Sequence, residues 1–116
     1  MDQKGNLCDL KCVPCHDKTI PPLTREEITP LLAQVPEWKL ADGAASITRS
    51  WKFKNFKEAE SFALSFGTKV GALAEEEDHH PDIAYGWGYY RITLQTHAIK
   101  GLHQNDFIVA AKIDAL

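Results

Sequence analysis

The stretch from Phe56 to Leu73 constrains the fold more than any other part of the chain, because its apolar residues recur at three- and four-residue steps. This spacing places them on one face of an α-helix that runs for about five turns. Asn55 stands directly before the stretch and can cap its first turn. We therefore predict a long core helix. Its apolar face contains Phe56, Ala59, Phe62, Ala63, Phe66, Val70 and Leu73.

Alternation of apolar and polar residues predicts β-strands before and after this helix. Residues 90–97 give the clearest strand, because every second residue from Tyr90 to Leu94 is apolar and the residues between them are polar. Residues 47–54 alternate in the same way, although Arg49 interrupts the apolar face. Weaker strands are predicted at 38–40, before the hairpin-type turn Asp42-Gly43, and at 83–87. The chain thus contains two pairs of candidate strands.

Two shorter helices complete the predicted order of elements. Thr24 and Glu27 have the spacing of a capping box at the start of the first, and the second runs from about Asn105 to Ala115. The order helix, two strands, helix, two strands, helix predicts the α+β class, with a four-stranded antiparallel sheet and three helices on one face, in two layers. In this prediction residues 22–116 form a single domain, and residues 1–21 form a flexible leader that contains cysteines.

Charge and hydropathy exclude several classes of partner. The formal net charge of −3 over 116 residues, without a basic stripe, gives no reason to expect nucleic-acid binding. The longest apolar run, 107–111, is far too short to cross a bilayer, and nothing near Met1 resembles a signal peptide. We therefore expect a cytoplasmic protein that has no membrane partner.

The cysteines of the leader allow three interpretations. Cys12, Cys15 and His16 have the spacing of a haem-attachment motif, but such attachment requires export, and Met1 is the only methionine. Together with Cys8 they offer the ligand types of a zinc knuckle, although they lie too close for the usual pair-loop-pair arrangement. The third interpretation is a leader with reduced thiols. The sequence leaves the role of these residues open.

The main cluster of titratable side chains follows the core helix. Residues 75–81 read Glu-Glu-Glu-Asp-His-His-Pro, and a third histidine, His97, ends the clearest strand. Imidazole exchanges protons readily near neutral pH, so such a cluster indicates acid–base chemistry. Pro81 disfavours a helical conformation at His80, and the helix must therefore end at or before the histidine pair. Acids at a helix C-terminus oppose the helix dipole, and a solvated acidic patch is the alternative interpretation.

Two classes of chemistry fit the histidines. In the first, His79 and His97 exchange protons with a substrate that His80 holds, and Asp106 fixes an imidazole tautomer. Asp106 could instead simply cap the last helix, because it falls in the first turn. In the second, these four residues bind a metal such as zinc. Adjacent residues of an extended segment point to opposite sides, so His79 and His80 cannot easily converge on one ion, and no catalytic metal is expected.

The order of these motifs resembles the pterin-4a-carbinolamine dehydratase family. The resemblance extends from about Pro22 to Leu116, and it is specific because several anchors match at once. The cysteine-containing leader is similar to extensions on some bacterial-type members. The matching features are His79-His80-Pro81, a following segment with tyrosines and Trp87, Ile92-Thr93-Leu94-Gln95-Thr96-His97, Gly101-Leu102 and Asp106.

The resemblance implies an enzyme that dehydrates 4a-hydroxytetrahydropterin, the 4a-carbinolamine, to quinonoid dihydropterin and uses no cofactor. The reaction would support the recycling of the tetrahydropterin that aromatic amino-acid hydroxylases use. Loss of water requires a proton delivered to the departing hydroxyl and a proton taken from N5, and imidazoles can serve both needs. Which histidine is the acid and which the base stays open. The resemblance implies catalytic roles for His79, His80 and His97, and substrate binding by Glu75, Asp78, Pro81, Thr96 and Asp106.

The family resemblance also implies a homodimer or homotetramer, which agrees with the open edges expected of the sheet. The sequence departs from the family pattern at Trp87, Gly88, Ile99 and His103, where the rim of the pocket is expected. Because some animal members also serve as dimerisation partners of a transcription factor, the alternative function is a non-catalytic pterin-binding or coactivator module.

Overall fold

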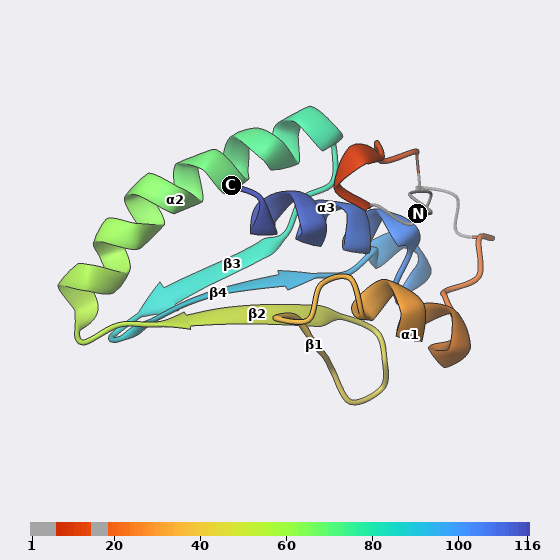
Figure 1. The fold of residues 1–116 in the computed structure, drawn as a ribbon, viewed down its shortest axis with the longest axis horizontal. Helices are drawn as coiled ribbons and strands as arrows, with labels where there is room; N and C mark the ends of the chain where they lie inside the picture. The colour runs from red at the N-terminus through yellow and green to blue at the C-terminus, as the bar shows by residue number, and fades with distance from the viewer. Residues whose placement is uncertain (1–6, 15–18) are drawn as a thin grey trace.

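The computed structural model describes residues 7–14 and 19–116 and shows helices packed against one sheet (Figure 1). Its helices and strands follow the predicted order, with short 3₁₀ helices added at two places. The elements are η1 (Leu7–Asp9), α1 (Arg25–Leu32), β1 (Lys39–Leu40), β2 (Ile47–Lys52), α2 (Phe56–Glu77), β3 (Asp82–Gly86), β4 (Tyr89–Leu94), η2 (His97–Ile99) and α3 (Gln104–Asp114).

The four strands form one antiparallel sheet in the order β1-β2-β4-β3. The strand with the clearest alternation, β4, is central, and its apolar residues Tyr90, Ile92 and Leu94 are fully buried. Helix α2 runs along the sheet with α3 beside it, and α1 packs near α3 (Figure 1). The predicted α+β class, with three helices and a four-stranded antiparallel sheet, is confirmed.

Local capping explains where the helices begin. Thr24 Oγ1 accepts a hydrogen bond from the Glu27 amide, and the Glu27 carboxylate accepts one from the Thr24 amide, so the predicted capping box is present. Asn55 caps α2 through a 2.9 Å bond from the Glu58 amide to its side-chain oxygen. Pro30 lies inside α1, which is only eight residues long. Proline beyond the first turn of a helix removes a backbone donor and tends to shorten or kink the helix.

An aromatic cluster fills the space between α2 and the sheet. Trp51 of β2 and Tyr90 of β4 pack against Phe62 and Phe66 of α2, with ring centroids 5.3–6.3 Å apart. Gly67 faces the same cluster, and a Cβ at this position would lie 3.2 Å from the Tyr90 hydroxyl. The small residue therefore lets the helix approach the sheet closely.

The Tyr90 hydroxyl is buried and, within the part of the chain that the structure describes, has no hydrogen-bond partner. Burial raises the pKa of Tyr90, so the phenol stays neutral. A buried hydroxyl without a partner loses its hydration and gains nothing in return. We expect Tyr90→Phe to raise the free energy of unfolding by about 1 kcal/mol, measured by urea denaturation. Tyr89→Phe on the half-buried neighbour is the control, and a destabilised Tyr90→Phe protein would contradict the expectation.

The described part of the leader packs against the domain, which the sequence did not indicate. Leu7 is 1% exposed and belongs to the core, and its amide donates to Gln34 Oε1 at 3.2 Å. The 3₁₀ helix η1 contacts α3. The flexibility predicted for the leader as a whole stays a prediction, and Cys15 and His16 lie outside the described residues.

Among the described residues, no helix is both long enough and apolar enough to cross a membrane.

Candidate functional site

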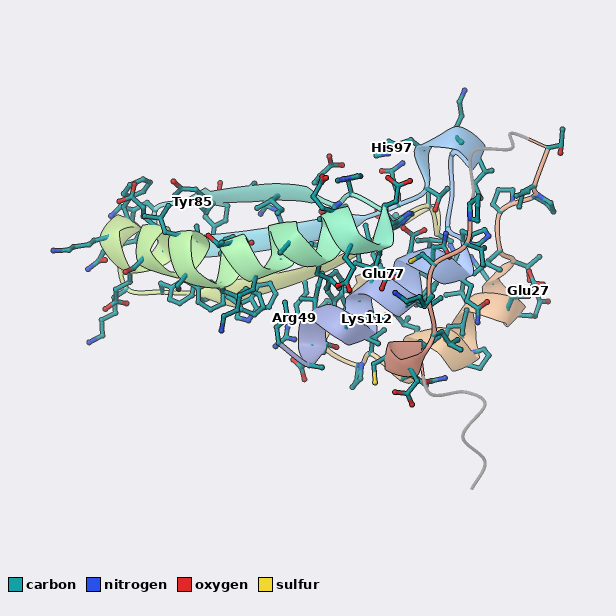
Figure 2. All side chains as sticks on the ribbon, turned by 90° about the horizontal axis from the view of Figure 1, so that it is seen from above. Glu27, Arg49, Glu77, Tyr85, His97 and Lys112 are labelled. Carbon is teal, nitrogen blue, oxygen red and sulfur yellow. The ribbon has the colours of Figure 1, made fainter. Side chains whose placement is uncertain are left out.

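A pocket of about 190 Å³ opens where the end of α2, the segment after it and the turn after β4 meet. Figure 2 shows His97 beside the end of α2 from which Glu77 projects. The pocket thus joins two stretches that stand apart in the sequence, the histidine pair and the segment that contains His97. It is lined by Asp78, His79, His80, Gln95, Thr96, His97 and Ala98.

The end of α2 directs His79 into the protein. Asp78 caps the helix in the left-handed region, with φ of 52°, and its amide donates to Ala74 O and Glu75 O. The amide of His79 also donates to Ala74 O, at 3.1 Å. This Schellman-type ending turns the chain away from the helix axis directly before the histidine pair. The prediction that the helix ends at or before the pair is confirmed.

His79 is held by a buried carboxylate. Its Nε2 lies 2.6 Å from Asp106 Oδ1, and the two residues are 6% and 0% exposed. Asp106 Oδ2 accepts hydrogen bonds from Thr96 Oγ1 at 2.8 Å and from the His103 amide at 3.0 Å. Because an ionised carboxylate only accepts, this pattern assigns a proton to His79 Nε2. Asp106 therefore fixes both the orientation and the tautomer of the ring, in addition to capping α3.

The other two histidines of the pocket are exposed to solvent. The His80 side chain is 53% exposed, and its Nε2 lies 2.7 Å from Glu75 Oε2 at the surface. The His97 side chain is 66% exposed, and its Nε2 lies 3.8 Å from Asp82 Oδ2. One pocket thus contains one imidazole fixed by a buried acid and two imidazoles that can exchange protons with water.

The structure brings most of the predicted site residues together. Asp78, Thr96 and the three histidines line the pocket, whereas Glu75 and Asp106 contact histidines. Pro81 follows the histidine pair and is half-buried, and it is not among the lining residues. Strand β4 ends at Leu94, three residues before the predicted end, and His97 begins the turn η2.

Sequence reasoning missed several residues of the site. Gln95 and Ala98 line the pocket, and Asp82 pairs with His97. Gln95 carried a signal, because it shares the polar face of the predicted strand with His97. Asp82 carried none, because its pairing depends on how β3 meets the turn after β4. In the described ranges, no three His, Cys, Asp or Glu residues are grouped so that they could hold a metal ion.

His103 occupies the N-cap position of α3. Its Nδ1 accepts a hydrogen bond from the Asn105 amide at 3.0 Å, the role for which serine, threonine and aspartate are the usual residues. Burial is the largest influence on this ring and lowers the pKa of His103; Asp106 raises it and His79 lowers it further, so the net shift is downward from 6.5. The cap requires the neutral form, in which Nδ1 has a free lone pair.

The His103 cap should make stability depend on pH. The pKa of His103 is lower in the folded chain than its ordinary value of 6.5. Its contribution to the free energy of unfolding is therefore complete above the unfolded value, and it is lost as pH falls through the folded one. We expect urea denaturation at pH 7 and pH 5 to show a smaller loss for His103→Ser than for the wild type. An equal loss in both proteins would contradict this cap.

The sequence is similar to a known protein family and to several of its members. The pattern of the family described as "Pterin 4 alpha carbinolamine dehydratase" matches residues 21–116. A protein of Methylococcus capsulatus named "Putative pterin-4-alpha-carbinolamine dehydratase" is 55% identical over 96% of this chain and 93% of its own length. One of the same name from Halorhodospira halophila is 50% identical over 96% of this chain and 97% of its own length.

A solved structure shows the same fold. The Brucella melitensis protein named "transcriptional coactivator/pterin dehydratase" is 35% identical, with a TM-score of 0.69 over 81% of this chain and 96% of its own. The family pattern covers the domain that builds the pocket, including each histidine that lines it. The chain belongs to the pterin-4a-carbinolamine dehydratase family.

Proposed function

We propose that the chain dehydrates 4a-hydroxytetrahydropterin to quinonoid dihydropterin by general acid–base catalysis. The observation that supports this most is the convergence of His79, His80 and His97 on one pocket. The pocket is smaller than the roughly 300–1,000 Å³ sites of drug-sized ligands, which suits a small ring system. Its lining offers both the donors and the acceptors that the loss of water requires.

The surroundings of the three imidazoles suit them to different steps of the proposed reaction. His79 is fixed by Asp106 and can bind or protonate a substrate in one defined orientation. His80 and His97 are exposed and can return to their starting protonation state by exchange with solvent. In the proposed reaction one imidazole donates a proton to the departing 4a-hydroxyl and another accepts the N5 proton. The net change is the release of one water molecule, without an electron acceptor.

The proposed reaction would support the recycling of tetrahydropterin for aromatic amino-acid hydroxylases, with quinonoid dihydropterin as its own product. Stopped-flow absorbance tests the activity: the purified chain is mixed with freshly generated 4a-hydroxytetrahydropterin, and the decay is compared with that in buffer alone. We expect acceleration that is proportional to protein concentration. Decay at the buffer rate with a folded chain would contradict the proposal.

We further propose that the chain forms a homodimer or homotetramer. Strand β3 is at an edge of the sheet, and the side chains of Ile83 and Tyr85 on it are exposed, with Phe56 of α2 packed beside Tyr85. Open strand edges and exposed apolar side chains favour association. Sedimentation velocity measures the assembly, and a monomer across the concentration range would contradict this proposal.

A non-catalytic coactivator module is the second candidate function. The name of the Brucella melitensis protein favours it, because that name includes both coactivator and dehydratase. Leu64 on α2 is 66% exposed and could contribute to a protein interface remote from the pocket. Binding to a transcription factor that survives loss of all three pocket histidines, in a chain without dehydratase activity, would favour this function over the first.

A further inference from the structure

Residues Cys12 and Val13 of the leader form a strap that connects the end of α2 to the start of α3. The Cys12 amide donates to Glu77 Oε1 at 2.9 Å, and Glu77 is the last residue of α2. The Val13 amide donates to Asn105 Oδ1 at 3.1 Å, and Asn105 Nδ2 donates back to Val13 O at 2.6 Å. Asn105 is the second residue of α3, so the strap is bonded to both helix ends.

The two anchors of the strap are buried polar side chains. Asn105 is 1% exposed, and both atoms of its amide are used by Val13. Glu77 is 7% exposed, and Lys112 of α3 binds its second oxygen at 2.7 Å (Figure 2). Burial alone would raise the pKa of Glu77, but the Cys12 amide and Lys112 outweigh it, so the pKa lies below 4.5. Glu77 is thus an ionised anchor and not part of a solvated acidic patch.

The strap joins the same two helix ends as the pair of site residues. Glu77 stands two positions before His79, and Asn105 stands directly before Asp106. The hydrogen bond between His79 Nε2 and Asp106 Oδ1 therefore crosses the junction that the strap spans. A small shift of α3 relative to α2 would change both connections together.

We propose that Glu77 and Asn105 are positioning residues, which use the strap to hold Asp106 against His79. The leader is then a part of the site and not only an appendage to the domain. The expected effect of the strap on turnover rests on the proposed function, whereas its expected effect on the position of the His79 ring does not. Displacement of catalytic groups by about 1 Å can cost on the order of a hundredfold in rate.

The test compares two alanine variants of α3 in the full chain. Asn105→Ala removes both bonds to Val13, and Asp114→Ala removes the bonds to Trp38 and Arg49 at the other end of the helix. In ¹⁵N-histidine-labelled protein, NMR measures the ring shifts and the titration of each histidine. We expect Asn105→Ala to change the ring shifts and the titration curve of His79, and Asp114→Ala to leave both at their wild-type values. Unchanged His79 signals in folded Asn105→Ala protein would overturn the proposal.

A second pair of variants covers the case in which Asn105→Ala does not fold. Glu77→Gln keeps an oxygen that can accept from the Cys12 amide, whereas Glu77→Ala removes it. We expect the His79 signals of Glu77→Gln to stay near wild type and those of Glu77→Ala to move. Equal displacement in both would overturn the proposal, because the charge on Glu77 and not the strap would then control the ring.

Kinetics separate this proposal from the proposed function. With 4a-hydroxytetrahydropterin we expect Asn105→Ala to lower kcat on the order of ten- to a hundredfold with little change in KM, and Asp114→Ala to change neither. A wild-type chain without dehydratase activity would refute the proposed function. Displaced His79 signals in Asn105→Ala would, even then, support the positioning role.

Discussion

Replacing His97 or His79 by alanine is expected to lower the dehydration rate by about a hundred- to ten-thousandfold, the range typical of general acid–base groups. His97→Ala is the cleaner of the two, because the His97 side chain is 66% exposed and its contact with Asp82 is long, at 3.8 Å. Its loss should therefore leave the fold intact while removing one imidazole from the pocket. Stopped-flow measurement of kcat and KM, with the unfolding temperature of each variant, checks this prediction.

The His79 variant needs a control, because its removal also leaves Asp106 with one partner fewer. His79→Gln retains a side chain that can donate to the carboxylate but cannot transfer a proton near neutral pH. We expect His79→Gln to be more stable than His79→Ala and equally deficient in turnover. A His79→Gln protein with wild-type kcat would show that this imidazole only supports the fold.

Removing the Asp106 carboxylate is expected to have the largest effect on stability. Asp106→Ala removes the fully buried carboxylate that accepts hydrogen bonds from the Thr96 hydroxyl and the His103 amide and that lies 2.6 Å from His79 Nε2. Breaking a buried pair in this way costs about 3–5 kcal/mol. Urea denaturation should show this loss, and the surviving folded protein should lack dehydratase activity.

Asp82→Ala provides the comparison for Asp106. Asp82 is also a carboxylate next to a pocket histidine, but its side chain is 68% exposed and lies 3.8 Å from His97. Exposed pairs of this kind contribute about 0–1 kcal/mol. If Asp106→Ala and Asp82→Ala lost the same small amount of stability, the buried network around His79 would not have the importance that we assign to it.

The fold could be predicted largely from the sequence because its elements carry strong local patterns. The apolar stripe after Asn55 predicted helix α2, and the alternation from Tyr90 to Leu94 predicted the central strand. Pro81 marked the end of α2, since the residue before proline avoids the helical conformation. These signals depend on neighbours in the chain and not on tertiary contacts.

The site was harder to predict, because its decisive contacts join residues far apart in the chain. His79 and Asp106 are 27 positions apart, and only the packing of α3 against α2 brings them together. The acidic residues before His79 cannot be told apart from the sequence, yet in the structure Glu75 is exposed, whereas Glu77 is buried and forms an ion pair with Lys112. The hydrogen bond from the Cys12 amide to Glu77 joins residues that are 65 positions apart, and no periodic pattern in the sequence indicates it.

We claim above all that the imidazoles around this pocket catalyse the proton transfers of the dehydration. The most direct measurement is the stopped-flow decay of 4a-hydroxytetrahydropterin with the His79→Gln/His97→Ala double variant, folded and at wild-type concentration. We predict decay at the rate of buffer alone, within the error of the measurement. Decay at the wild-type rate would contradict the claim.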